Sequence, residues 1–254
     1  MSSELRVALW NLCSKTYLSF DDDKSHYDRP RENDYRSLTP YIWAEFFHKP
    51  VDSMPSNLVM RYKEIRDAFF AFEWHQAYDF IDYLSSLTAN SFAPEVFRGL
   101  ANEILEDWIS AYHFVNGELV EISDKTEIEA IEEAAAQDTS SARHIALALE
   151  NLAKRPHDFK GCIVESILAV EAEARELTGK QTVTLSEALV ELRKRHPLHE
   201  TQIAAMRKMY AYTNTDTGLR HAMSEEPNLD LADAKYMLVI CAAFVNLLRT
   251  RKSA

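Results

Sequence analysis

Arg220 and His221 are adjacent, and side chains of these two types can together cleave a phosphodiester bond without a metal ion. The arginine guanidinium carries a fixed positive charge that binds phosphate, and the histidine imidazole can exchange a proton near neutral pH. The pair follows Gly218 and a polar break in an apolar helical pattern, at the expected start of the next helix. Cations are disfavoured at a helix start, so this placement calls for a carboxylate partner or an anionic ligand.

A structural explanation of the same residues competes with the catalytic one. His221 can hydrogen-bond the loop at Asp216, and the side chains of Asn214 and Asp216 can form local turns and cap the next helix. In the catalytic interpretation, Asn214 and Asp216 instead orient Arg220 and His221. Both interpretations stay open at the level of the sequence.

Three polar residues interrupt an otherwise apolar helix and are candidates to line the same pocket. They are Glu165, Ser166 and Glu171, although Glu171 can instead pair with Arg175 one helical turn later. Together with Tyr212, we group them as supporting residues that contact RNA.

We expect no metal ion and no cofactor, because the chain has none of the usual spacings of metal ligands, phosphate-binding glycines or catalytic serines. His196 and His199 are three residues apart, but no carboxylate–histidine pattern completes a site around them. Cys13, Cys162 and Cys241 form no CxxC pair, which is typical of reduced thiols in a cytoplasmic protein.

The charge is distributed unevenly between the two halves of the chain. The net charge is −12, which argues against general coating of nucleic acid. Residues 1–137 hold 12 Lys and Arg against 25 Asp and Glu, whereas residues 138–254 hold 16 against 15. This asymmetry indicates two units with different partners. The N-terminus lacks the pattern of a signal peptide and no apolar run approaches 18 residues, so we expect a cytoplasmic protein with no membrane partner.

The apolar periodicity predicts an all-α fold with one small β-hairpin. The hairpin is expected over residues 113–122, around Asn116-Gly117, because both central residues of a tight hairpin turn need positive φ. Residues 21–37 are polar and predict a loop, after which Thr39 would cap a helix that starts at Pro40. The aromatic residues from Trp43 to Trp74 have helical spacing, which favours a core over base stacking.

Further helices are expected on both sides of a boundary near residue 138. In the first half, Pro94 begins a helix that runs to about Tyr112, and Ser123-Asp124 caps another over 125–136. In the second half, helices over 141–154, 158–178, 184–194, 197–212 and from Asp230 onward predict a helical bundle, with Gly179 as a C-cap.

Two segments of the second half, Phe159–Glu171 and Tyr210–Ala222, resemble a HEPN-type domain. The continuation through Pro227–Asn246 resembles the AbiJ-related abortive-infection proteins more closely. Segments of the first half resemble one class of AbiJ N-terminal domain: Leu5–Asn11, Ile42–Pro50 and Phe114–Ile122. The resemblance thus implies an AbiJ-type N-terminal helical domain with a β-hairpin over residues 1–137, followed by a HEPN-like helical bundle over residues 138–254.

The same resemblance implies an activity. Active HEPN ribonucleases dimerise and place two Arg-x(4–6)-His motifs at the shared interface, where no metal is required. Their histidine assists attack of the ribose 2′-hydroxyl on the phosphate, and their arginine binds that phosphate. Carried over to this chain, the catalytic residues are His221 and Arg220, the substrate is RNA such as tRNA, and the C-terminal domain forms a homodimer.

The chain departs from that motif at the arginine. The spacing places an arginine at 214, 215 or 216, where the chain has Asn214, Thr215 and Asp216. Arg220 is instead adjacent to His221, and adjacent residues of a helix point roughly 100° apart. Arg193 and His199 fit the spacing, but they lie at a helix junction outside the family position.

Two functions therefore remain open, with a third for the first half. The first is an anti-phage effector that cuts RNA during abortive infection. The alternative is a catalytically inactive HEPN-like module that binds RNA or a nucleotide or serves dimerisation. In addition, the acidic N-terminal domain could sense a phage-derived trigger, although its sequence identifies no ligand.

Overall fold

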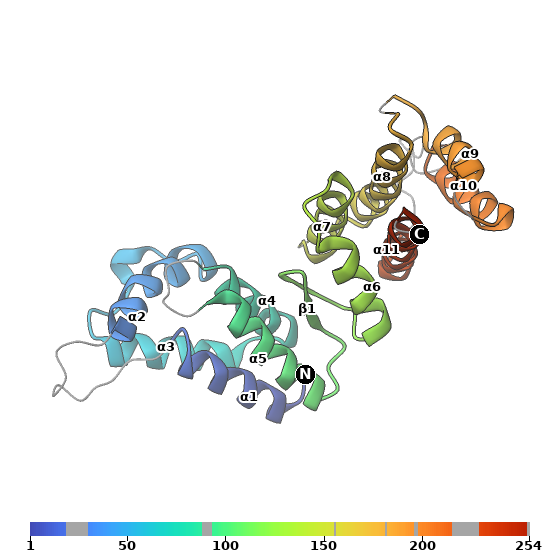
Figure 1. Ribbon diagram of the computed structural model, residues 1–254. Coiled ribbons are helices and arrows are strands. Elements are labelled where there is room, and N and C mark those ends of the chain that lie inside the picture. The colour runs from blue at the N-terminus through green and yellow to red at the C-terminus, as the bar shows by residue number, and fades with distance from the viewer. Residues whose placement is uncertain are drawn as a thin grey trace. The chain divides into compact units, whose positions relative to one another are not determined.

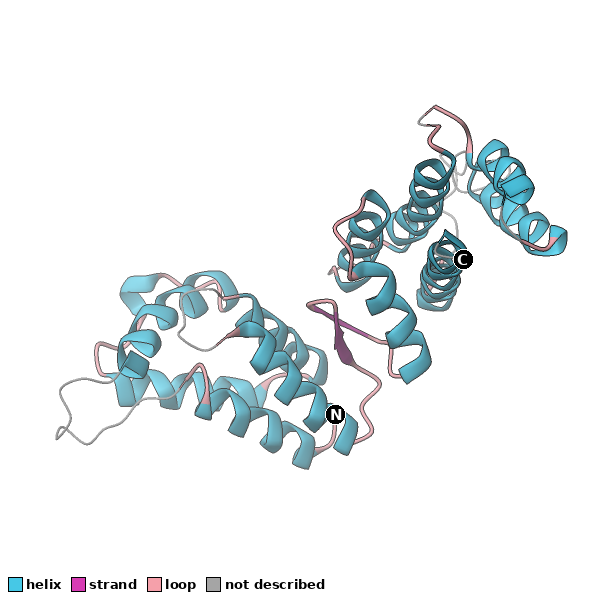
Figure 2. Ribbon diagram, in the orientation of Figure 1, coloured by secondary structure: helices cyan, strands magenta, loops and turns pink. Residues whose placement is uncertain are grey.

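The computed structural model (Figure 1) describes residues 1–18, 30–87, 93–154, 156–180, 182–195, 198–214 and 229–252. Figure 2 shows that these residues are mainly helical, with a single two-stranded sheet among them, so the expected all-α class is confirmed. Contacts between residues divide the chain into two compact units, Met1–Leu119 and Val120–Ala254. The helix α6 (Lys125–Ala135) thereby groups with the second unit, where it packs against α11 (Leu231–Lys252).

The first unit is a helical domain with an aromatic core. The ring of Phe80 lies 5.1 Å from Phe46 and 5.7 Å from Phe69, and Trp43 is buried as well. Trp74 is the exception to the predicted core, because 48% of its surface is exposed. The elements of this unit are α1 (Ser3–Lys15), α2 (Pro30–Tyr41), η1 (Ile42–Phe46), η2 (Val51–Ser53), α3 (Leu58–Ala71), α4 (Trp74–Ser86) and α5 (Pro94–Asp107).

Helix α2 corrects the prediction of a loop over 21–37 and of a helix that starts at Pro40. Residues 21–29 lie outside the described part, but α2 already begins at Pro30, and Pro40 lies inside it. Pro40 has no N–H for the carbonyl of Arg36, and the Thr39 hydroxyl donates to that carbonyl instead (3.4 Å). Thr39 is therefore part of the helix and not its N-cap.

The predicted hairpin is confirmed. Strands β1 (His113–Val115) and β2 (Glu118–Val120) pair, and the residues between them are Asn116 and Gly117. Both have positive φ, 48° and 96°, as a tight two-residue turn between twisted strands requires. The Asn102 side chain, from α5, bonds both the N–H and the carbonyl of Phe114, which anchors β1 to α5.

Helix α5 ends five residues before the predicted Tyr112. Its last turn closes as a Schellman motif, in which the N–H of Ile109 donates to Glu106 O (2.9 Å) and that of Ser110 to Leu105 O (2.8 Å). The residue at the left-handed position of this motif is commonly glycine, but here it is Ile109, with φ of 50°. The left-handed conformation costs a non-glycine residue about 1–2 kcal/mol.

The second unit is a bundle built around α8 (Phe159–Thr178). Helices α7 (Ser140–Ala153) and α11 pack along α8, and α9 (Leu185–Arg195) and α10 (Glu200–Asn214) pack on the same bundle. The predicted caps are confirmed: Asp124 accepts from two backbone N–H groups at the start of α6, and Gly179 ends α8 with φ of 69°. Helix α11 buries an apolar stripe formed by Ala234, Leu238, Cys241, Val245 and Leu248.

A buried polar network ties four elements of this bundle together. Arg249 of α11 donates to Glu173 Oε2 (3.0 Å), to Ser141 Oγ (3.0 Å), to Thr139 Oγ1 (3.1 Å) and to the carbonyl of Ala134 (3.0 Å). Ser141 also donates to Glu173 (2.6 Å), so the carboxylate of this 2%-exposed residue is well satisfied. Removing one member would leave a buried charge without its partner, which is strongly destabilising.

Helix α11 has an apolar composition that the sequence analysis did not anticipate. Residues Leu231–Arg251 are long and apolar enough to cross a membrane by length and composition. However, the helix packs against α6, α7 and α8 within its own unit. Core helices of globular bundles share this composition, so it is weak evidence for a membrane span.

Candidate functional site

The catalytic candidates fall on a segment that the structure does not describe. Arg220, His221 and Asp216 lie in 215–228, outside the described residues. Tyr212 and Asn214 belong to the last turn of α10, which immediately precedes this segment. The segment therefore joins α10 to the region just before α11 in the chain, and these two helices border a pocket.

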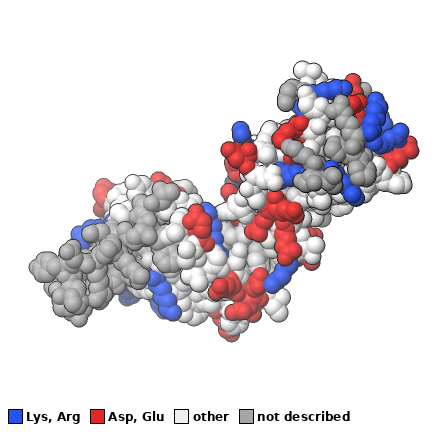
Figure 3. Space-filling model, in the orientation of Figure 1, with Lys and Arg blue, Asp and Glu red and all other residues white. Residues whose placement is uncertain are grey.

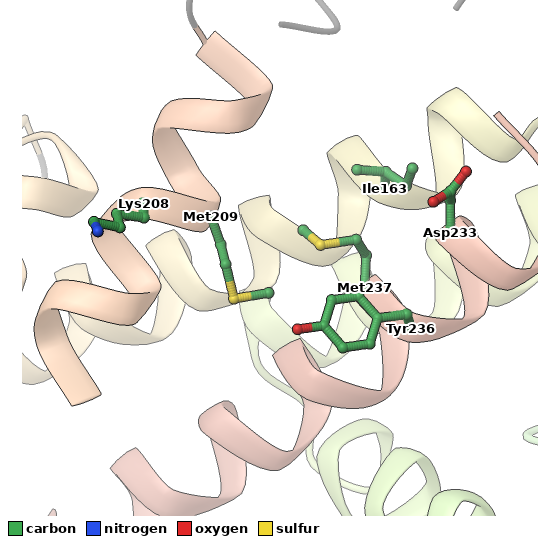
Figure 4. A pocket seen from close by; sticks show the side chains of 6 residues that line it. All are labelled: Ile163, Lys208, Met209, Asp233, Tyr236 and Met237. Carbon is green, nitrogen blue, oxygen red and sulfur yellow. The ribbon is translucent and has the colours of Figure 1, made fainter. Parts of the chain in front are cut away.

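The pocket lies between α8, α10 and α11 and has a volume of about 340 Å³. In Figure 4, Met209 of α10 and Met237 and Tyr236 of α11 point toward one another across it, and Ile163 of α8 lines its far side. Lys208 and Asp233 lie at its opposite ends. An apolar pocket with a few charged groups at its edge is the usual form of a small-ligand site.

Basic side chains gather around α9 and α10 (Figure 3). Arg193 pairs with Glu200 (3.2 Å) and Lys194 with Glu191 (3.2 Å), so both are neutralised locally. Arg207 and Lys208 form no ion pair with any residue of the described part of the chain. These two cations are thus available to an anionic ligand beside the pocket.

Glu165 has a partner that the sequence analysis missed. Its carboxylate lies 2.7 Å from Nδ1 of His144 on α7, and both side chains are about one quarter exposed. A carboxylate that holds Nδ1 leaves Nε2 of the imidazole for proton exchange. The pair is remote from the pocket around α8, since Glu165 is two residues from Ile163 and hence roughly 200° away on the helix. No local sequence rule could have found it, because the two residues are 21 apart on different helices.

Ser166 and Glu171 each have a local partner. The buried Ser166 hydroxyl donates to the carbonyl of Cys162 one turn earlier (2.7 Å). Glu171 accepts from Arg175 (2.6 Å), which confirms the predicted i,i+4 pair, and Arg175 also donates to the carbonyl of Val183 (2.9 Å). Their contacts stabilise α8 and the turn after it, and Glu165, Ser166 and Glu171 do not converge on a common point.

The described residues contain no group of three His, Cys, Asp or Glu side chains that could hold a metal ion. The three cysteines are buried as free thiols. Burial raises the pKa of Cys162 to about 12 and raises the pKa of Cys13 and Cys241 further. Such thiols are poor nucleophiles in the native state.

Comparison with known families gives one match. The family model AbiJ N-terminal domain 4 matches residues 1–137, which is more than half of the chain. The match covers the whole first unit together with α6. No curated protein and no solved structure matches the chain. The protein therefore belongs to the AbiJ N-terminal domain 4 family, whose name suggests a function in abortive infection against phage.

Proposed function

We propose that the protein is an anti-phage effector whose second unit, a HEPN-like bundle, cuts RNA without a metal ion. His221 acts as the general base and acid, and Arg220 binds the scissile phosphate. The supporting residues are Asn214, Asp216 and Tyr212, which adjoin the pair in sequence. The family membership of the first 137 residues supports the defence role.

The single observation that carries this proposal is the pocket between α10 and α11. It has an apolar floor formed by Met209, Met237 and Ile163, which suits a nucleobase, and Lys208 at its edge, which suits a phosphate. The chain segment with Arg220 and His221 connects the two helices that border this pocket. This topology supports a role for the pair at the same place.

The chemistry balances without a cofactor. The His221 imidazole removes the proton from the ribose 2′-hydroxyl, and the resulting oxygen attacks the adjacent phosphorus. The bond from phosphorus to the 5′-oxygen breaks, and the imidazolium returns the proton to that leaving oxygen. Arg220 stabilises the charge that develops on the phosphoryl oxygens. The products are a 2′,3′-cyclic phosphate and a 5′-hydroxyl.

A homodimer through the second unit fits the altered motif. The sequence predicts that Arg220 and His221 start a helix, and adjacent residues of a helix point about 100° apart, so with that geometry one chain would not readily aim both at one phosphate. A partner copy could supply the second of the two side chains. Tyr236 on α11 is 60% exposed and marks an apolar position of this unit for such an interface.

The experiment is cleavage of total tRNA in EDTA by the wild type and by three histidine variants. His221→Ala should abolish cleavage, whereas His75→Ala, an exposed histidine of the first unit, should leave it unchanged. His144→Ala tests the histidine that contacts Glu165, and it should cleave like the wild type if His221 is the catalytic histidine. If His221→Ala cleaves as fast as the wild type, His221 is not catalytic.

The alternative is an inactive HEPN-like module that binds RNA or a nucleotide, or that only dimerises. One observation favours it: Asn214 ends α10 close to the place where active members of the resembled family have their arginine. In that case wild-type protein binds tRNA in a gel-shift assay, Lys208→Ala weakens the binding, and no cleavage product forms in any condition.

A further inference from the structure

The first unit contains a second pocket, with a volume of about 440 Å³, that the proposed nuclease does not use. It is formed by the start of α1 at Met1, Ser2 and Leu5, by the first turns of α4, and by the segment 108–112 after α5. All of these residues belong to the first unit. Four of the lining residues are aromatic: Trp74, Tyr78, Trp108 and Tyr112.

The aromatic rings form walls at an angle to one another. Tyr78 and Tyr112 stack with their ring centroids 4.6 Å apart and their planes at 28°. The Trp74 plane is inclined by 78° to Tyr78 and by 50° to Tyr112, each at 6.3 Å, so it makes a separate wall. Aromatic walls at such angles suit a cation, which the electron-rich ring faces attract.

Several large apolar side chains of this pocket are exposed to solvent. Trp74 and Trp108 are about half exposed, and Ile109 is 92% exposed. Ile109 also holds the left-handed position where glycine would fit without strain. Folding of the unit gains nothing from an exposed isoleucine in this conformation. Strained residues of this kind are concentrated at functional sites, and a contact with a ligand accounts for both the strain and the exposure.

The charge around the pocket favours a cationic ligand. Residues 1–119 hold 11 Lys and Arg against 19 Asp and Glu. Three exposed carboxylates directly precede lining residues in sequence: Glu4, Glu73 and Asp107. Figure 3 shows acidic side chains gathered where α1 begins and α5 ends. The C-terminal end of α5 presents the negative pole of its helix dipole, whereas the starts of α1 and α4 present positive poles, so the acidic side chains and not the helix dipoles favour a cation.

The nearby cation Arg6 is directed toward the end of α3. Its guanidinium donates to the carbonyls of Phe69 (3.0 Å) and Phe72 (2.6 Å), so its hydrogen bonds serve the end of α3. Hydroxyl oxygens for N–H donors are present in the pocket at Tyr78 and Ser110, which lie 3.0 Å from each other. A planar guanidinium can stack on an aromatic ring and donate to such oxygens at its edge.

We propose that this pocket binds an arginine side chain presented by a partner protein, whose apolar residues contact Trp108 and Ile109. The nucleobase alternative fits less well, because the phosphates of a nucleic acid would meet an acidic surface. The site would make the first unit a sensor of basic proteins, independent of how the second unit acts.

The test is titration of the ¹⁵N-labelled full chain with N-acetyl-arginine amide, observed at the indole N–H signals. The chain has four tryptophans. The signals of the pocket residues Trp74 and Trp108 should shift, while those of the buried Trp10 and Trp43 stay in place as internal references. The neutral isostere N-acetyl-citrulline amide should cause much smaller shifts, and higher salt should weaken the arginine probe.

Two variants and one control complete the test. Trp108→Ala should lower the affinity for N-acetyl-arginine amide by roughly tenfold, since a cation–π contact is lost. Ile109→Gly should weaken binding of a blocked Leu-Arg-Leu peptide. Because this substitution relieves backbone strain, a loss of binding cannot be attributed to a loss of folding. Tyr41→Ala, a half-exposed aromatic of the same unit outside the pocket, should bind like the wild type.

Three results would overturn the proposal. The first is the absence of selective Trp74 and Trp108 shifts in the millimolar range of the arginine probe. The second is an equal response to citrulline amide or to AMP, which would assign the pocket to a neutral or nucleotide ligand. The third is tighter binding of free arginine than of the blocked form, which would assign it to the amino acid and not to a protein.

Discussion

The packed helices of the two units are stabilised by different kinds of side chain. The first unit holds all four tryptophans and 10 of the 12 phenylalanines, and its core combines aliphatic side chains with a set of ring contacts around Phe69 and Phe80. The second unit has an aliphatic bundle that is closed by the buried Arg249–Glu173 network. The stability of packed rings depends on how well their shapes fit. The stability of a buried ion pair depends on the presence of both charged partners.

The two pockets differ in the same way. The pocket of the first unit has aromatic walls within an acidic unit, and that of the second has methionines, with Lys208 and Asp233 at its opposite ends and Arg207 nearby on α10. The first suits a cation and the second an anion. In our two proposals, the uneven charge of the chain corresponds to two ligands of opposite sign.

Phe80→Ala should have the largest effect on stability. It removes a fully buried ring that contacts Phe46, Phe69 and Phe72, and the expected loss is about 3–5 kcal/mol. Because every tryptophan lies in the first unit, intrinsic fluorescence during urea unfolding reports that unit, while circular dichroism reports both. The urea midpoint measured by fluorescence should fall. The midpoint of the part of the circular dichroism signal that comes from the second unit should stay unchanged. A joint shift of both would show that the units unfold together.

Glu173→Ala should destabilise the second unit and leave the first unit unchanged. It leaves the nearly buried Arg249 guanidinium without its carboxylate, at a cost of about 3 kcal/mol. The circular dichroism midpoint should fall and the tryptophan midpoint should hold. Glu129→Ala, an exposed carboxylate on α6, is the matched control and should change stability by less than about 0.5 kcal/mol.

Alkaline pH should weaken both units. The folded-state pKa values of the thiols lie above their ordinary value of 9.0, so the stability that the protonated thiols contribute is nearly complete at pH 8 and declines as the pH rises through 9.0 toward the folded values. Between pH 8 and 9.5 each thiol should account for a loss of about 0.5–1 kcal/mol. The second unit has two such thiols and the first has one. In the first unit burial also raises the pKa of Tyr17, Tyr35, Tyr78 and Tyr83, so that unit should lose stability as well. An unchanged urea midpoint of the second unit at pH 9.5 would contradict the burial of Cys162 and Cys241.

Ile109→Gly should have the smallest effect, and of opposite sign. Relief of the left-handed isoleucine should stabilise the first unit by about 1 kcal/mol, reduced by the greater freedom of glycine in the unfolded chain. The tryptophan midpoint in urea should rise slightly. Destabilisation would mean that the exposed isoleucine makes a contact important for folding.

The elements that were predictable from the sequence depend on local rules. Asn116-Gly117 predicts its turn, Asp124 its cap and Gly179 its helix end, because each residue type satisfies the backbone directly. Helix α2 was missed because Pro40 is typical of a helix start, and because the buried spacing of Tyr35, Leu38 and Ile42 is interrupted by polar residues.

The features that were not predictable depend on tertiary contacts. Nothing in the sequence joins His144 to Glu165, or Arg249 to Glu173, across different helices. Likewise, no local rule places an isoleucine at the left-handed position after α5, or gathers Trp74 with Trp108 at one pocket. The candidate pair Arg220 and His221 was found by residue type and by the resemblance to HEPN-type domains, and not by any tertiary contact.

The most direct test of the central claim is the chemistry of the RNA ends that the wild-type protein produces in EDTA. Attack by the 2′-hydroxyl predicts a 2′,3′-cyclic phosphate and a 5′-hydroxyl, and a single 2′-deoxy substitution at the cleavage site should block the cut. Ends with a 3′-hydroxyl and a 5′-phosphate, or cleavage that depends on added Mg²⁺, would contradict metal-independent cleavage by His221.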